Sequence, residues 1–83
     1  MDQEGYKTKN INIGAYLYAS NLKLIKTLRI DGEVFFLFAP KNKAEDLVNQ
    51  YFAGTANINP RELFARLNDL RDLIFQGGRN PHD

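Results

Sequence analysis

The chain has 83 residues, a quarter of them charged, and a formal net charge of +1. This length fits one domain with a modest core, and the balanced charge indicates neither a strongly basic nucleic-acid binder nor an acidic mimic. The absence of cysteine excludes disulfides, thiolate nucleophiles and cysteine-ligated zinc. The chain starts without the basic and then apolar pattern of a signal peptide, and no apolar run is long enough to span a membrane. We therefore expect a cytoplasmic protein with no membrane contact.

The first predicted element is a short strand over residues 6–9. Residues 1–5 are polar, and we expect them to form a flexible N-terminus. Tyr6-Lys-Thr-Lys alternates weakly between apolar and polar side chains, which favours a strand, and its expected place is beside residues 34–38. A short helix is predicted next, over residues 13–19, with Asn10 or Asn12 as its capping residue.

The strongest local signal is a β-hairpin over residues 22–40. Asp31-Gly32 accepts the positive φ angles of a two-residue turn, and runs of β-branched, aromatic and other apolar residues flank it. With these two residues as the turn, pairing extends residue by residue to Ile25 and Phe38. The second strand of the hairpin is apolar without alternation, which indicates a central strand that is buried on both faces.

A helix is predicted to follow the hairpin. Asn42-Lys-Ala-Glu45 has the spacing of a capping box and marks its start, and Gly54 is placed to end it in a left-handed turn. Five residues recur at the spacing of one helical stripe and are predicted to be buried: Ala44, Leu47, Val48, Tyr51 and Phe52.

The last predicted helix covers residues 60–75, with Asn59 as its cap and Gly77-Gly78 closing it. Glu62 and Arg66 are spaced to form an exposed ion pair. The predicted buried stripe is Leu63, Leu67, Leu70 and Ile74, with Phe64 beside it.

These elements predict a single α+β domain over residues 6–76, followed by a flexible tail over residues 77–83. The order is β-α-β-β-α-α. A right-handed crossover through the first helix makes the first two strands parallel, with the third antiparallel between them. The small three-stranded sheet therefore has the order 1-3-2, with its helices mainly on one face. Large apolar side chains remain on the other face, where either the tail and the connector or a second copy of the chain must cover them, and we infer a homodimer.

Five segments carry a resemblance to a known family: Tyr6-Lys-Thr-Lys, Ala15-Tyr-Leu-Tyr-Ala-Ser-Asn, Asp31-Gly-Glu-Val-Phe-Phe-Leu-Phe, Asp46-Leu-Val-Asn-Gln-Tyr-Phe-Ala-Gly54 and Asn59-Pro-Arg-Glu-Leu-Phe. In this order they resemble a small uncharacterised prokaryotic domain family, a domain of unknown function met in bacterial and mobile-element genomes. The resemblance covers residues 6–75. It implies no activity and assigns no site residues.

The sequence predicts no catalytic, cofactor or metal site. His82 is the only histidine and falls in the tail. Asp69 and Asp72, three residues apart on the last helix, supply too few oxygens for a hard cation. Neither a phosphate-binding loop nor a nucleophile motif is present. We therefore expect a non-enzyme that needs no cofactor.

Basic residues are concentrated early in the chain. Between Gly5 and Ile30 there are five basic residues and no acid, whereas residues 31–83 carry eight acids against six bases. A sheet face that mixes basic and aromatic side chains can neutralise phosphates and stack unpaired bases. The candidate nucleic-acid contacts are Lys7, Lys9, Lys23, Lys26, Arg29, Phe36 and Phe38. In the alternative, structural interpretation, the basic stems cover neighbouring phenylalanines while their charges stay in water.

Two functions therefore stay open. The first is a small accessory module that acts through protein–protein contacts, by self-association or with another protein. It would use the uncovered sheet face or the outer surface of the last helix, where the candidate residues are Arg61, Ala65, Asn68 and Asp72. The second is a weak nucleic-acid-binding protein that uses the basic and aromatic sheet face.

Overall fold

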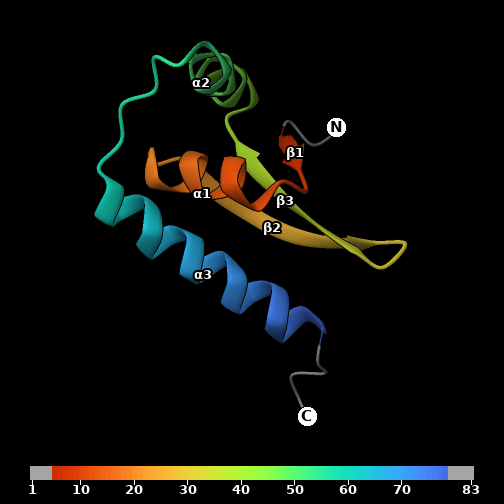
Figure 1. Cartoon of the computed structure of the whole chain (residues 1–83). Coiled ribbons are helices and arrows are strands. Elements are labelled where there is room, and N and C mark those ends of the chain that lie inside the picture. The colour runs from red at the N-terminus through yellow and green to blue at the C-terminus, as the bar shows by residue number, and fades with distance from the viewer. Residues whose placement is uncertain (1–4, 79–83) are drawn as a thin grey trace.

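The computed structural model describes residues 5–78 and confirms the predicted α+β class and element order (Figure 1). The elements in chain order are β1 (Tyr6–Thr8), α1 (Ile11–Ala19), β2 (Lys23–Ile30), β3 (Glu33–Ala39), α2 (Lys41–Ala53) and α3 (Pro60–Gly78). Most of the ends that were expected to be flexible, residues 1–4 and 79–83, lie outside the described residues, as does His82.

The sheet has the predicted order β1-β3-β2, and β3 pairs antiparallel with both neighbours. The turn between β2 and β3 forms at Asp31 and Gly32, whose φ angles are 52° and 81°. Positive φ at both central residues gives the turn a twist that matches the twist of the flanking strands. The most apolar strand is therefore central, as its sequence predicts.

The hairpin register is confirmed from the turn as far as Lys26, which pairs with Leu37. The predicted pair of Ile25 with Phe38 is wrong, because a β-bulge at Ile25 makes Leu24 the partner of Phe38. One extra residue reverses the alternation of side chains beyond the bulge. Leu24 consequently turns toward the core, and Lys23 turns to the opposite face.

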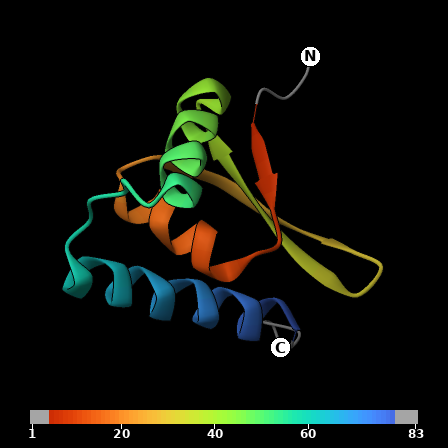
Figure 2. The same cartoon turned by 45° about the horizontal axis from the view of Figure 1, so that its top comes forward.

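Helix α1 forms the centre of the core. Figures 1 and 2 show α1 against one face of the sheet and α3 running beside α1. Phe36 and Phe38 of β3, Leu17 of α1 and Leu70 of α3 are fully buried in one cluster, which also contains Val48 of α2. The three helices thus share the apolar side chains on one face of the sheet.

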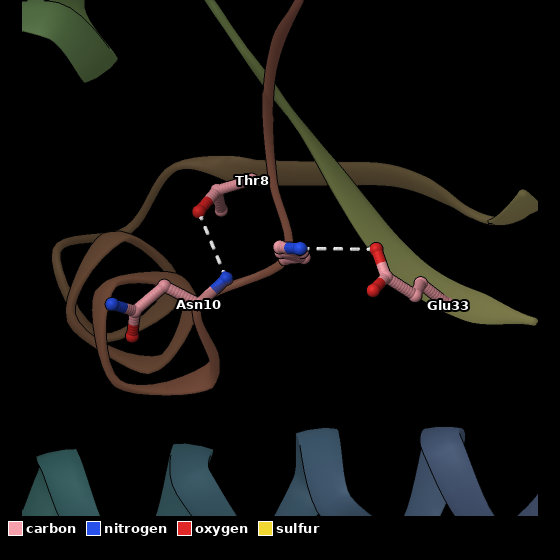
Figure 3. Close-up of polar contacts among 4 residues, drawn as sticks. Thr8, Asn10 and Glu33 are labelled. Carbon is pink, nitrogen blue, oxygen red and sulfur yellow. Dashed lines mark hydrogen bonds and ion pairs between the residues drawn. The ribbon is translucent and has the colours of Figure 1, made fainter.

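The start of α1 is fixed by Asn10, one of its two candidate caps. The Asn10 side-chain oxygen accepts hydrogen bonds from the backbone N–H groups of Asn12 and Ile13, at 2.9 and 3.2 Å. The Thr8 hydroxyl in turn accepts a hydrogen bond from the Asn10 N–H at 3.1 Å (Figure 3). The chain therefore turns directly from β1 into the helix.

The predicted capping box of α2 is wrong. The helix begins at Lys41, with Pro40 in the cap position and no side-chain cap, so Asn42 already lies in the first turn. The predicted end is confirmed, since Gly54 has a left-handed φ of 79°. At α3 the Asn59 side chain accepts hydrogen bonds from the N–H groups of Arg61 and Glu62, as predicted.

Three predictions about α2 and α3 are also wrong. Helix α3 continues through Gly78, and within the described residues Arg66 forms its ion pair with Asp69 rather than with Glu62. The stripe of α2 is buried at Ala44 and Val48, but Phe52 is 71% exposed. Phe52 stays exposed because the connector carries α3 away from α2, so that α3 covers α1 instead (Figure 1).

Gly14 allows α1 to lie close to α3 and to the sheet, which leads to a first prediction. A Cβ atom at this position would lie 3.1 Å from Leu70 Cδ1 and 3.4 Å from Phe36 Cδ2. Gly14→Val should therefore lower the free energy of unfolding by about 1–3 kcal/mol through overpacking. Urea denaturation measures this loss. Ala65→Val on the exposed side of α3 is the control, with an expected loss below about 0.7 kcal/mol. Equal stability of Gly14→Val and the wild type would contradict the packing.

Tyr16 gives a pH prediction. It is buried in the core, and this burial raises the pKa of its hydroxyl above the ordinary value of 10.0. Because the folded-state pKa is the higher one, the stabilisation is present below about pH 10 and is lost as the pH rises through the folded-state pKa. Tyr16→Phe should thus lose less unfolding free energy than the wild type between about pH 8 and about pH 11. Urea titrations at both pH values test this. Equal losses for the variant and the wild type would show that Tyr16 does not contribute to the pH dependence of stability.

Candidate functional site

The structure buries the two phenylalanines that the sequence offered as a nucleic-acid platform. Phe36 and Phe38 are both 0% exposed, because they lie on the sheet face that α1 covers. The ring of Tyr18 lies 6.1 Å from that of Phe38, between centroids. The predicted platform of Phe36 and Phe38 is therefore wrong, since no ligand reaches either ring.

A different set of basic and apolar residues shares the other face of the sheet. Paired residues on neighbouring strands project to the same face. Leu37 of β3 pairs with Lys7 of β1 and with Lys26 of β2, which makes one row across all three strands. The rows on either side consist of Lys23 with Ala39 and of Leu28 with Phe35. We call this surface the basic sheet face, and it comprises Lys7, Lys23, Lys26, Leu28, Phe35 and Leu37.

The centre of the basic sheet face is apolar and slightly hollow. Gly5, Lys7, Lys26, Leu28 and Leu37 line a depression of about 380 Å³. Leu37 is buried because the backbone at Gly5 lies against it, so that a Cβ atom there would be 2.6 Å from Leu37 Cδ1. The Lys7 ammonium lies 5.5 Å from the centroid of the half-buried Phe35 ring. Two exposed lysines thus border an apolar floor, and one of them lies beside an aromatic ring.

The charge on this face is positive. Glu33, at the hairpin end of β3, forms an ion pair with Lys9 at 3.0 Å (Figure 3). Both side chains are more than half exposed, so the pair contributes little to stability and mainly cancels two charges. Within residues 5–78, Lys7, Lys23 and Lys26 form no ion pair. Three uncompensated positive charges therefore remain.

Arg29 does not belong to this group. It pairs with Val34 on the helix side of the sheet, and its guanidinium lies 3.5 Å from the carbonyl oxygen of Gly32. There it lines an open groove of about 770 Å³ with Ile74 and Phe75 of α3. The five candidate basic residues are thus divided: three lie on the basic sheet face, whereas Lys9, which is paired with Glu33, and Arg29 both line the groove beside α3.

On the helix side, all four candidate interface residues of α3 are exposed: Arg61, Ala65, Asn68 and Asp72. A neighbouring aromatic surface was not predicted. Phe64 is 62% exposed and lines a cavity of about 160 Å³ together with Tyr51. The Phe52 ring meets Tyr51 edge-on, with 5.3 Å between centroids. We call Tyr51, Phe52 and Phe64 the aromatic patch. The one signal for it in the sequence is that Phe64 falls beside the leucine stripe of α3.

Two further observations concern the described part of the chain. In residues 5–78, no three acidic or histidine side chains are grouped so that they could hold a metal ion. None of the helices in this range is both long enough and apolar enough to cross a bilayer.

The basic sheet face is therefore a surface on which three unpaired lysines and the half-buried Phe35 ring lie together. Its chemistry suits a ligand that carries several negative charges and flat apolar groups. Comparison of the chain with protein-family models, curated proteins and solved structures gave no match, so the resemblance to an uncharacterised prokaryotic domain family stays a prediction.

Proposed function

We propose that the protein is a non-enzymatic binding module and that its basic sheet face binds single-stranded nucleic acid. The observation that carries this proposal is the row of Lys26, Leu37 and Lys7 beside the Phe35 ring. None of the described helices packs on this face. Positive charge and an apolar floor are therefore both accessible to a ligand.

The geometry suits an extended strand of nucleotides. Neighbouring strands in a sheet are about 4.8 Å apart, so Lys7 and Lys26 flank β3 with about 10 Å between their backbones. Their flexible stems allow the ammonium groups to contact phosphates along one backbone, and Lys23 extends the row of charges. Unpaired bases then lie over Leu28 and Phe35, where an aromatic ring contributes by stacking.

The same charges disfavour a second copy of the chain as the ligand of this face. In a two-fold symmetric contact, each surface meets itself. Lys7, Lys23 and Lys26 of one copy would then face the same lysines of the other, and like charges at close range are destabilising. The basic sheet face thus favours an anionic partner over the self-association that the sequence suggested for it.

The contribution of the lysines is tested by the double variant Lys7→Gln/Lys26→Gln. We expect it to bind labelled single-stranded DNA and RNA several-fold more weakly. The slope of log affinity against log salt should flatten by about 1.4, or ~0.7 for each of the two phosphates that no longer binds a lysine. Fluorescence anisotropy at low and near-physiological salt measures both quantities.

The matched control is Lys43→Gln/Arg71→Gln, which removes the same charge from exposed positions on α2 and α3. If both double variants change affinity equally, only net charge matters and the site is wrong. If the wild type binds no oligonucleotide at low salt, the proposal fails. Binding of poly-glutamate but not of oligonucleotides would indicate an acidic protein as the partner instead.

The aromatic contribution is tested by Phe35→Leu, which keeps an apolar side chain on β3 and removes the ring. Stacking of a base on an aromatic side chain is worth about 1–3 kcal/mol, so affinity should fall by about fivefold to a hundredfold. The salt slope should not change, because no charge is removed. Phe75→Leu on α3 is the control with the same substitution. An unchanged affinity for Phe35→Leu would show that bases do not stack on this ring.

A further inference from the structure

Strand β2 forms one edge of the sheet, and its outer side has no partner strand among residues 5–78 (Figure 1). Of its residues, Leu24 and Leu28 are half-buried and the others are exposed, including Ile25 at 42% and Ile30 at 40%. The described helices make at most marginal contact with this strand. The outer side of β2 is therefore accessible to a further extended chain.

The register of the hairpin determines which backbone groups of β2 point outward. Ile30 and Glu33 flank a two-residue turn, so they exchange backbone hydrogen bonds with each other. Pairs with and without such bonds then alternate along the hairpin, and the pairs of Thr27 and Arg29 are of the second kind. Their N–H and C=O groups point away from β3. Residues 26–30, between the bulge and the turn, therefore offer two donors and two acceptors to an extended chain.

The charge along this edge favours an acidic chain. β2 contains Lys23, Lys26 and Arg29 but no acidic residue. None of these three side chains forms an ion pair within the described residues. Opposite charges on neighbouring strands stabilise their pairing, whereas like charges directly opposite each other destabilise it. A segment with glutamate or aspartate opposite Lys26 and Arg29 therefore gains an interaction that an uncharged strand lacks.

The same charges disfavour a second copy of the chain at this edge. In an edge-to-edge dimer the two β2 strands would lie about 4.8 Å apart, and both sets of three basic residues would line one ladder. Lysine on an edge strand is one of the usual features that prevent pairing between copies. Discrimination of this kind rests on repulsion of the wrong partner, so it does not act against a strand of opposite charge.

A groove beside the edge suits the side chains of an acidic segment. Arg29 lines the groove of about 770 Å³ together with Val34 of β3 and Ile74 of α3, both of which are half-buried. Lys9 and Glu33 also line it, but their charges cancel in an ion pair, so Arg29 leaves the groove with a net positive charge. Alternate residues of a strand added to β2 project to this side. A carboxylate there can pair with Arg29, and the apolar wall at Ile74 favours an apolar side chain beside it.

We propose that residues 26–30 of β2 form a docking edge for an extended acidic segment of another protein, which adds to the sheet as a fourth strand. The backbone of Thr27 and Arg29 supplies the hydrogen bonds, and the charges of Lys26 and Arg29 select acidic side chains. The docking edge differs from the basic sheet face, because it uses the outer side of β2 and the groove on the helix side. The inference does not depend on binding of nucleic acid, although Lys26 borders both surfaces.

Fluorescence anisotropy with a labelled synthetic peptide tests the docking edge. The probe consists of Glu-Glu-Val-Val repeats, which present acidic and apolar side chains on both faces of an extended chain. We expect saturable binding with a dissociation constant in the micromolar range. The control peptide has Glu-Glu-Pro-Pro repeats and the same charge. It should bind at least about tenfold more weakly, because proline has no N–H to donate to the edge. Equal affinities would show that only charge matters and would overturn the proposal.

The backbone contribution is tested by Thr27→Pro, with Thr27→Val as its matched control. The Thr27 N–H points outward, so proline removes a hydrogen bond to the peptide and leaves the ladder with β3 intact. Affinity for the peptide should fall by about threefold to tenfold for Thr27→Pro, whereas Thr27→Val keeps the donor and should bind as the wild type does. Equal affinities of the two folded variants would contradict strand addition.

Two single variants separate the docking edge from the basic sheet face. Arg29→Gln should weaken peptide binding severalfold and leave the affinity for single-stranded DNA unchanged, whereas Lys7→Gln, on β1 beyond β3, should do the reverse. For the wild type, amide NMR shifts caused by the peptide should map to residues 26–30, a measurement that needs no variant. Peptide binding that is lost in Lys7→Gln but kept in Arg29→Gln would overturn the docking edge. The absence of saturable peptide binding at low salt would overturn it as well.

Discussion

The close approach of α1 to the sheet and to α3 is the constraint on which the rest of the structure depends. Gly14 makes this approach feasible, because its missing side chain leaves room for Leu70 on one side and for Phe36 and Phe38 on the other. A short helix that is buried on both sides brings its two neighbours into one core. The remaining surfaces of the domain are those that this arrangement leaves uncovered.

Two surfaces follow from the burial of α1. Because α3 packs mainly on α1, the last turns of α2 keep Tyr51 and Phe52 at the surface. Because α1 occupies one face of β3, none of the helices in residues 5–78 covers the side chains that alternate to the other face. The basic sheet face carries three lysines, whereas the aromatic patch consists of uncharged rings. The two surfaces therefore suit partners of different chemistry.

The sequence predicts local structure well where a local cause decides it. Asp31-Gly32 sets the register of the hairpin, and Asn10, Asn59 and Gly54 set helix ends, since each acts on backbone atoms within a few residues. The burial of Phe36 rather than Phe35 was not predictable in this way. Packing across the whole chain decides which face of an apolar central strand the helices cover. Phe36 and Phe38 were therefore wrongly expected on the uncovered face.

The bulge at Ile25 shows how one backbone irregularity serves the core and the surface together. Strict alternation would place Leu24 on the basic sheet face and Lys23 beside the buried phenylalanines. Desolvation of the Lys23 charge there would have a high cost. With one extra residue in β2, Leu24 pairs with Phe38 on the helix side and Lys23 pairs with Ala39 on the open side. The gain in burial for Leu24 and the solvation of Lys23 both favour the bulge, although it disrupts one step of the ladder. The shift that completes the core therefore also adds the third lysine to the basic sheet face.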